Sequence, residues 1–269
     1  MTTSGFGIGF SSGSFGPSSS GFNKGIFYPV GISLPSSGPA FVSSGLILNL
    51  DASTYSGTGN WLDQSGNNYN GTISGATYSS TNGGLFDLDG SNDIISVAHN
   101  SNLSLSTSVQ KTIQVWFKVD SLPSSPARMI LFAKLSGGFS FDGYWGGITS
   151  GGLVTYATNG GSISRTVNST STISIDTWYL FTFISQITST SNTSKVFINE
   201  TEYISSAHGS DTYSESNNLV LGYFPTPHTD LGSDAYFNGK VGACYFYDRA
   251  LTIEEISTNF NATKIRFGL

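Results

Sequence analysis

Short stretches in which apolar and polar residues alternate are the feature of this sequence that most limits its fold. The clearest is KTIQVWFKV, where Ile113, Val115, Phe117 and Val119 fall on one side and the residues between them on the other. A period of two is typical of a half-buried β-strand. Similar stretches recur along the chain, for example GLILNLDA, TWYLFTFIS and KVGACYFYD, and turn residues separate nearly all of them.

The order of these stretches predicts the fold class. No helical crossover lies between them, which excludes a parallel α/β sheet and favours two antiparallel sheets packed face to face. The composition agrees, since only 10% of the residues are charged and 13% are aromatic. We therefore predict an all-β, antiparallel two-sheet jelly-roll β-sandwich with one short C-terminal helix and an extended N-terminal arm.

The one helix is predicted by the stretch ALTIEEI. Thr252 can cap the backbone N–H of Glu255 while the Glu255 side chain reaches back, and Leu251 and Ile256 are spaced as a hydrophobic staple. Ile256 and Phe260 then form an apolar stripe. We expect a structural helix that lies across the sandwich and covers a sheet edge.

A change of composition divides the chain. Residues 1–50 contain no Asp or Glu and one basic residue, Lys24, whereas all 17 acidic residues lie from Asp51 onward. The Gly- and Ser-rich leader has too little apolar surface to fold alone. It is either a flexible linker or an arm that orders against another subunit, and its spaced phenylalanines favour the arm. The predicted parts are an arm at 1–43, a jelly-roll domain at 44–262 and a tail at 263–269.

Charge and hydropathy exclude several kinds of partner. The net charge of −6 and a pI of about 4.8 argue against nucleic acid. No apolar stretch approaches the roughly 20 residues that span a membrane, so no membrane insertion is expected. The N-terminus MTTSGFGIGF lacks the features of a secretion signal. The single cysteine, Cys244, lies among apolar residues, which predicts a buried side chain without a disulfide.

Seven motifs occur in the order found in a known group of domains: GLILNLDA, WLDQSGNNYNGTI, LDGSNDII, KTIQVWFKV, TWYLFTF, VFINETEY and FNGKVGACYFYDRALTIEEI. On these motifs, residues 44–262 resemble laminin G-like, concanavalin A-like lectin/glucanase domains. One hairpin departs from the pattern, because Asn199-Glu200 replaces the usual Asn-Gly. Glu tolerates a positive φ poorly, so a longer loop is expected there.

The ending NFNATKIRFGL and the leader FYPVGISLP are similar to those of virion proteins of tailed, marine bacteriophages. This resemblance implies a phage virion structural protein, associated with capsid decoration, neck, tail or fibre. The arm would bind other virion proteins, the chain would form a homo-oligomer on the particle, and the sandwich would face outward to a cell-surface polysaccharide. The implied localisation is the virion, assembled in the host cytoplasm and released by lysis.

Resemblance to the glucanase members of that superfamily implies catalytic acids spaced Glu-x-Asp-x-x-Glu on one strand. The acidic residues of this chain do not follow that spacing. Retaining hydrolysis needs two carboxyl groups about 5 Å apart. Glu200 with Glu202, and Glu254 with Glu255, fit solvated surface positions better. We predict that the chain is not an enzyme. The alternatives are a bacterial surface adhesin module, which needs an export route, and a glycoside hydrolase whose acids come from distant strands.

Two stretches combine aromatic faces with polar groups, as sugar binding requires. The alternative for each aromatic is packing in the core or between subunits. The candidate glycan-binding residues are Asp142, Tyr144 and Trp145 in GGFSFDGYWGGITSGG, and Tyr223, Phe224, His228 and Asp230 in LGYFPTPHTDLGSDAYF.

One acidic stretch, FDLDGSND, has the oxygen donors that calcium prefers. Asp87 and Asp89 project to one side of a predicted strand, and Asp93 returns after a Gly turn. The spacing is not that of an EF-hand, and Asp-Gly turns also form for purely conformational reasons. No cofactor is required, and calcium is the candidate cation.

Overall fold

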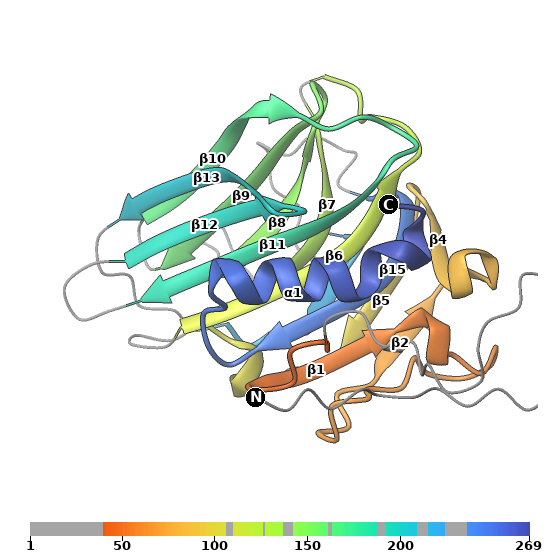
Figure 1. The fold of residues 1–269 in the computed structure, drawn as a ribbon. Helices are drawn as coiled ribbons and strands as arrows, with labels where there is room; N and C mark the ends of the chain where they lie inside the picture. The colour runs from red at the N-terminus through yellow and green to blue at the C-terminus, as the bar shows by residue number, and fades with distance from the viewer. Residues whose placement is uncertain are drawn as a thin grey trace, which may run out of the picture. The chain divides into compact units, whose positions relative to one another are not determined.

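The computed structural model describes residues 40–105, 110–125, 127–136, 142–160, 163–187, 192–208, 215–223 and 236–269. Two antiparallel sheets pack face to face in this part of the chain (Figure 1), which confirms the predicted sandwich. The predicted arm lies outside the described residues up to residue 39.

Within the described residues, one sheet has eight strands and the other has seven. The first contains, in order, β13 (Thr201–His208), β12 (Asn192–Ile198), β11 (Trp178–Ile187), β6 (Gln110–Val119), β15 (Asn238–Tyr247), β4 (Leu85–Asp89) and β3 (Thr77–Ser79), with β1 (Leu46–Asp51) paired to β15. The second contains β10 (Ile163–Thr172), β9 (Leu153–Gly160), β8 (Gly143–Thr149), β7 (Arg128–Leu135), β14 (Leu219–Leu221), β5 (Ile94–Val97) and β2 (Gly71–Ser74). Short 3₁₀ turns lie at Ala52–Thr54, Thr81–Gly83, Ser101–Leu103 and Lys264–Phe267.

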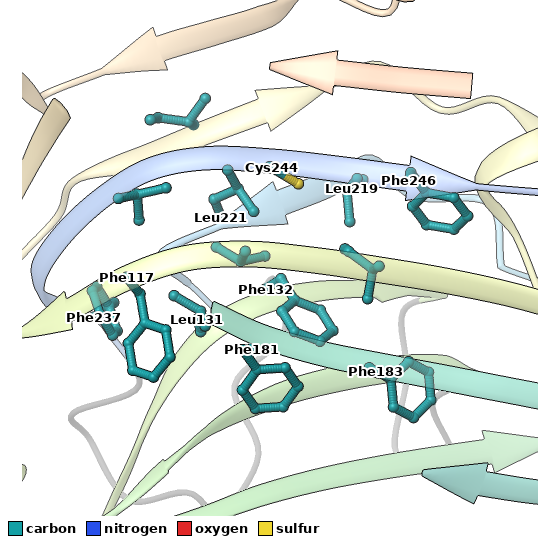
Figure 2. Packing of buried hydrophobic residues seen from close by; sticks show 14 of the residues in the cluster. Phe117, Leu131, Phe132, Phe181, Phe183, Leu219, Leu221, Phe237, Cys244 and Phe246 are labelled. Atoms are coloured by element: carbon teal, nitrogen blue, oxygen red, sulfur yellow. The ribbon is translucent and has the colours of Figure 1, made fainter. Parts of the chain in front are cut away.

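The main core lies between the two sheets. The predicted alternation of β6 holds, because Ile113, Val115, Phe117 and Val119 all point into this core and are buried. Figure 2 shows Phe117 beside phenylalanines and leucines from several other strands. Cys244 of β15 is also buried there, which confirms its predicted place. Burial raises the pKa of its thiol far above the ordinary value.

The helix α1 (Ile253–Thr263) begins as predicted. The Thr252 hydroxyl accepts a hydrogen bond from Glu255 N, and the Glu255 carboxylate accepts one from Thr252 N. The sequence had indicated that this helix covers a sheet edge, and that expectation is wrong. The helix lies across the outer face of the eight-stranded sheet, over β6 and β15 (Figure 1). No helix among the described residues is long and apolar enough to cross a membrane.

The outer face of β6 carries the apolar side chain of Trp116, and the helix removes this face from water. Trp116 stacks on Phe267 with 4.3 Å between ring centroids, and Phe260 stacks 5.7 Å from Trp116 on the helix side. Asn259 is buried, and its amide donates to Gln114 Oε1 and Tyr247 Oη. The segment predicted as a tail therefore packs into the fold.

The hairpin between β12 and β13 is shorter than predicted. Ile198 pairs directly with Thr201, so Asn199 and Glu200 form a two-residue turn. Only Asn199 has a positive φ, of 57°, and Asn adopts that conformation at low cost. The longer loop was expected because Glu200 was assumed to need a positive φ. Glu200 does not adopt one, so the two-residue turn forms.

Candidate functional site

An open cleft lies on the outer face of the seven-stranded sheet, beside β14. Its volume is about 390 Å³, within the range of small-molecule sites. Ile94 and Ser96 of β5 form its floor with Val220 of β14, and Tyr223 borders it. Their β5 neighbours Ile95 and Val97 point into the core, so the period of the strand places Ile94 and Ser96 outward. We call this the β14 cleft, and its remaining lining residues are Ser216, Asn217 and Asn218.

A second cleft, of about 430 Å³, lies farther along the same strands. Thr72 of β2 and Ala98, which follows β5, form its floor. Around them stand His99, Tyr69 and the side chains of five asparagines, each of which carries two donors and an acceptor. We call this the asparagine cleft, and the asparagines are Asn60, Asn67, Asn68, Asn70 and Asn100.

A single carboxylate holds the loop that supplies most of these amides. Asp63 Oδ1 accepts hydrogen bonds from Asn49 N and Ser65 N, and its Oδ2 accepts one from Tyr69 N at 3.0 Å. Asn70 Oδ1 in turn accepts from Asp63 N. Because these bonds tie the loop backbone, the positions from which its asparagines project are fixed before any ligand arrives.

A buried lysine lies behind both clefts. Lys134 of β7 is 0% exposed, and its Nζ contacts His99 Nδ1 at 2.9 Å and donates to Asn217 O at 2.7 Å. His99 borders the asparagine cleft and Asn217 borders the β14 cleft. His99 N also donates to Asn218 Oδ1 at 3.0 Å. One side chain thus fixes the two cleft walls to the same strand.

A buried carboxyl group completes this polar cluster. Glu215 is 5% exposed, and its Oε1 accepts a hydrogen bond from Leu105 N at 2.9 Å. Burial raises the pKa of Glu215 to about 7, although the backbone N–H groups and the Lys134 ammonium oppose the shift. Burial likewise lowers the pKa of Lys134 to about 8 against the attraction of Glu215. These groups are enclosed, so they shape the site and do not line it.

Two of the predicted glycan-binding aromatics prove to be buried. Tyr144 and Trp145 lie in β8, not in a loop, and are 1% and 2% exposed. Tyr144 points into the main core and donates from its hydroxyl to Leu103 O. Trp145 packs on the outer face with Ala133 and Ala157, its cross-strand neighbours. Neither ring face is available to a sugar, so packing, the alternative reading, holds for both.

The other predicted glycan-binding residues lie in different places. Asp142 precedes β8, its backbone bonds Ser136 after the end of β7, and it lines neither cleft. Tyr223 does border the β14 cleft, and its ring stacks on Tyr236 with 4.4 Å between centroids. The remaining three predicted residues, Phe224, His228 and Asp230, lie outside the described residues.

The three aspartates predicted to hold calcium do not converge. Asp87 forms an ion pair with Lys240 at 3.5 Å. Asp93 is buried, and its Oδ2 accepts a hydrogen bond from Asp89 N, while Asp89 Oδ1 accepts from Ser91 N. Both bonds tighten the turn between β4 and β5, the conformational role that Asp-Gly turns usually have. Among the described residues, no group of three or more His, Cys, Asp or Glu residues could hold a metal ion.

The acidic pairs that were compared with a catalytic strand serve as structural contacts. Glu200 Oε1 accepts from Asn261 Nδ2 at 3.0 Å, and Glu202 pairs with Lys195 at 3.1 Å. Glu255 forms a two-pronged ion pair with Arg249, at 2.7 Å for each bond.

Sequence reasoning missed the asparagine cleft. The run NNYN at residues 67–70 was read only as part of a family motif, although three amides within four residues are a signal in themselves. The contributions of Asn60, Asn100 and His99 come from other loops, and only the fold brings them together.

A sequence profile described as Laminin_G_3, concanavalin A-like lectin/glucanases superfamily, matches residues 88–257. No curated protein matches the chain.

Solved structures with the same fold include carbohydrate-active and toxin proteins. Domain 4 of AbnA, an extracellular arabinanase from Geobacillus stearothermophilus solved with arabinotriose, is 18% identical, with a TM-score of 0.60 over 81% of this chain and 98% of that one. The receptor-binding domain of botulinum neurotoxin mosaic serotype C/D is 17% identical, with a TM-score of 0.61 over 81% and 51%. A Trypanosoma rangeli sialidase mutant is 13% identical, with a TM-score of 0.61 over 84% and 34%.

Proposed function

The chain belongs to the concanavalin A-like lectin/glucanase superfamily, and from that premise we propose that it is a carbohydrate-binding module. It holds a glycan on the outer face of the seven-stranded sheet, in the two clefts. The observation that carries the proposal is the asparagine cleft, where five asparagines and a tyrosine line a space of about 430 Å³. Asn67, Asn70 and Asn100 also bond the chain itself, while Asn60 and Asn68 are exposed. Amide groups bond the vicinal hydroxyls of a sugar as both donors and acceptors.

The proposal is one of binding without hydrolysis. Neither cleft is lined by Asp or Glu within the described part of the chain, and hydrolysis of a glycosidic bond needs a pair of such groups. Domain 4 of the arabinanase, solved with arabinotriose, offers a precedent for sugar bound by a domain of this fold.

The test is direct. The full chain is applied to an array of plant, algal and bacterial glycans, and hits are measured by titration calorimetry. We expect binding in the micromolar to millimolar range, without release of reducing sugar. A variant carrying Asn60→Ala and Asn68→Gly should lose the binding, because both side chains are exposed in the cleft. An Asn199→Gly variant, at the far turn between β12 and β13, is the control. Absence of binding to every glycan, or cleavage of a bound one, contradicts the proposal.

We further propose that the module is part of a phage virion, associated with capsid decoration, neck, tail or fibre. The support is the resemblance of the leader and ending to virion proteins, together with an acid-free leader that has too little apolar surface to fold alone. Many copies on a particle would convert weak single-site binding into firm attachment to a cell-surface polysaccharide.

The virion role predicts protease protection. Residues 1–39 should be cleaved in the isolated chain and protected in purified particles, as followed by mass spectrometry. Phe41 and Val42 pack on the outer face of the eight-stranded sheet and should resist cleavage in both. A chain that is absent from particles, or whose leader is cleaved equally in every assembly, contradicts the virion role and leaves the glycan-binding proposal standing.

A further inference from the structure

The two clefts lie on one continuous surface. Thr72 of the asparagine cleft pairs across the strands with Ser96 of the β14 cleft, and Ser96 pairs with Val220. Side chains of directly paired residues on one face lie about 5 Å apart. No strand separates the clefts, because Thr72, Ser96 and Val220 are direct neighbours across β2, β5 and β14.

The combined floor is longer than one sugar ring. Ile94 in the β14 cleft and Ala98 in the asparagine cleft are four residues apart along one extended segment, which spans roughly 13 Å. Asn60 adds width to this surface, because Trp61 bridges Gly71 and so places Asn60 in register with Thr72, on the side of β2 away from β5. The dimensions fit several consecutive units of a chain.

The surface carries no formal charge on its lining. Within the described residues, no Asp, Glu, Lys or Arg side chain borders either cleft. Carboxylates and sulfates are usually recognised by Arg or Lys, which form charge-assisted hydrogen bonds. The imidazole that lines the asparagine cleft, that of His99, has its Nδ1 against the Lys134 ammonium, which has donors and no acceptor. The ring proton therefore lies on Nε2, where it can donate to a hydroxyl.

The walls are also held at a constant separation. Lys134 bonds the wall of each cleft, and the bond from His99 N to Asn218 Oδ1 joins the two walls directly. A rigid groove of this kind loses little conformational entropy when a chain enters it, which favours binding across its full length.

We propose that the β14 cleft and the asparagine cleft form a single groove that binds consecutive units of an uncharged, linear polysaccharide. This inference rests on the proposed carbohydrate-binding function. It adds the class of the ligand, neutral, and the manner of binding, along the chain and across both clefts.

The experiment measures affinity against chain length and charge. The full chain is titrated with arabino-, laminari- and galacto-oligosaccharides of one to six units, and with oligogalacturonates and oligosialic acids of matched length. We expect a neutral series to gain at least about tenfold in affinity between one and four units, since several more hydrogen bonds form. The acidic series should bind more weakly than the best neutral series at every length.

One variant in each cleft tests whether they act together. Tyr223→Ala alters the β14 cleft, and Asn68→Gly alters the asparagine cleft while keeping its left-handed backbone, where φ is 61°. Each should weaken the six-unit ligand about fivefold or more, whereas the shortest ligand that binds should respond to only one of them. Asn199→Gly is again the control, and thermal melting verifies that each variant is folded.

The outcomes separate the two proposals. Three results would overturn the single neutral groove and leave carbohydrate binding intact. They are a monosaccharide that binds as tightly as the six-unit chain, a preference for the acidic series, and a six-unit ligand whose affinity is unchanged by either variant. Failure of every neutral and acidic sugar to bind rejects the carbohydrate-binding function itself, and the groove with it.

Discussion

Lys134 is the residue with most influence on the site, although it does not touch the cleft surface. Its pairing with Tyr144 across β7 and β8 turns it between the sheets, where its whole side chain is buried. A buried ammonium is costly unless every donor has a partner. The partners at hand are Asn217 O and His99 Nδ1, one from each cleft wall.

The Lys134→Met variant should lower both stability and binding. Methionine keeps the apolar stem but leaves Asn217 O and the buried Glu215 carboxyl without the ammonium, so the thermal midpoint should fall. The loss of two wall contacts should weaken a bound neutral oligosaccharide about five- to tenfold by calorimetry. The matched control is Lys195→Met on β12, whose ammonium pairs with Glu202 of β13, at the far edge of the other sheet. Unchanged affinity in Lys134→Met would remove the positioning role.

Glu215 makes stability depend on pH in a defined direction. Its pKa is about 7 in the folded chain, against 4.5 for an ordinary glutamate, so between these values the folded state binds more protons than the unfolded state. The free energy of unfolding therefore falls as pH rises from 4.5 to 7.

Comparison with Glu215→Gln checks this. The amide can still accept from Leu105 N and does not titrate. The unfolding free energy of the native chain should drop relative to the variant by up to about 3 kcal/mol across that range, measured by urea denaturation at each pH. A difference that stays constant with pH, or grows in favour of the native chain, would contradict the assigned cause.

At the scale of the element, α1 shows how a local signal and a tertiary contact cooperate. The capping box at Thr252 and Glu255 satisfies backbone donors at the start of the helix, and Arg249 holds Glu255 in place with two 2.7 Å bonds. The face carrying Ile256 and Phe260 then covers β6 and β15. The helix stabilises the sandwich because it removes the outer face of those strands from water.

Thr252→Ala should cost about 1 kcal/mol of stability, the usual loss for an N-cap hydroxyl. Thr258→Ala is the matched control, because that hydroxyl donates to Glu254 O of the same helix and alanine is favoured in helix interiors. Denaturant midpoints of the two variants give the comparison. Equal midpoints for both would show that the cap contributes nothing measurable.

At the scale of the whole molecule, the last residues of the chain pack on the outer face of the eight-stranded sheet. Phe267 lies against Gly242 of β15, where a Cβ would stand 2.5 Å from its ring. Its ring stacks on Trp116 with 4.3 Å between centroids and contacts Trp178 in a tilted arrangement with 4.6 Å between centroids. The C-terminal segment is thereby fastened to the middle of the eight-stranded sheet. Arg266 adds an ion pair to Asp51, at the end of β1.

Phe267→Ala should therefore destabilise the whole sandwich by about 3 kcal/mol or more, since it opens a cavity between two indoles. For a chain of this size the thermal midpoint should fall by at least about 6 °C. Leu269→Ala, at a side chain that is 45% exposed, should leave the midpoint nearly unchanged. A small effect of Phe267→Ala would mean that the end of the chain is not part of the cooperative unit.

The sequence alone determined the class of fold and the start of the helix, because both depend on local patterns. Alternation in KTIQVWFKV sets which side chains enter the core, and Thr252 with Glu255 marks a helix start in any context. Tertiary structure decided the site. Tyr144 and Trp145 look like a sugar platform between glycines, yet both faces of β8 are buried, and burial depends on which strands pair beside them. The groove likewise exists only because Thr72, Ser96 and Val220, far apart in the chain, are hydrogen-bonded neighbours in the sheet.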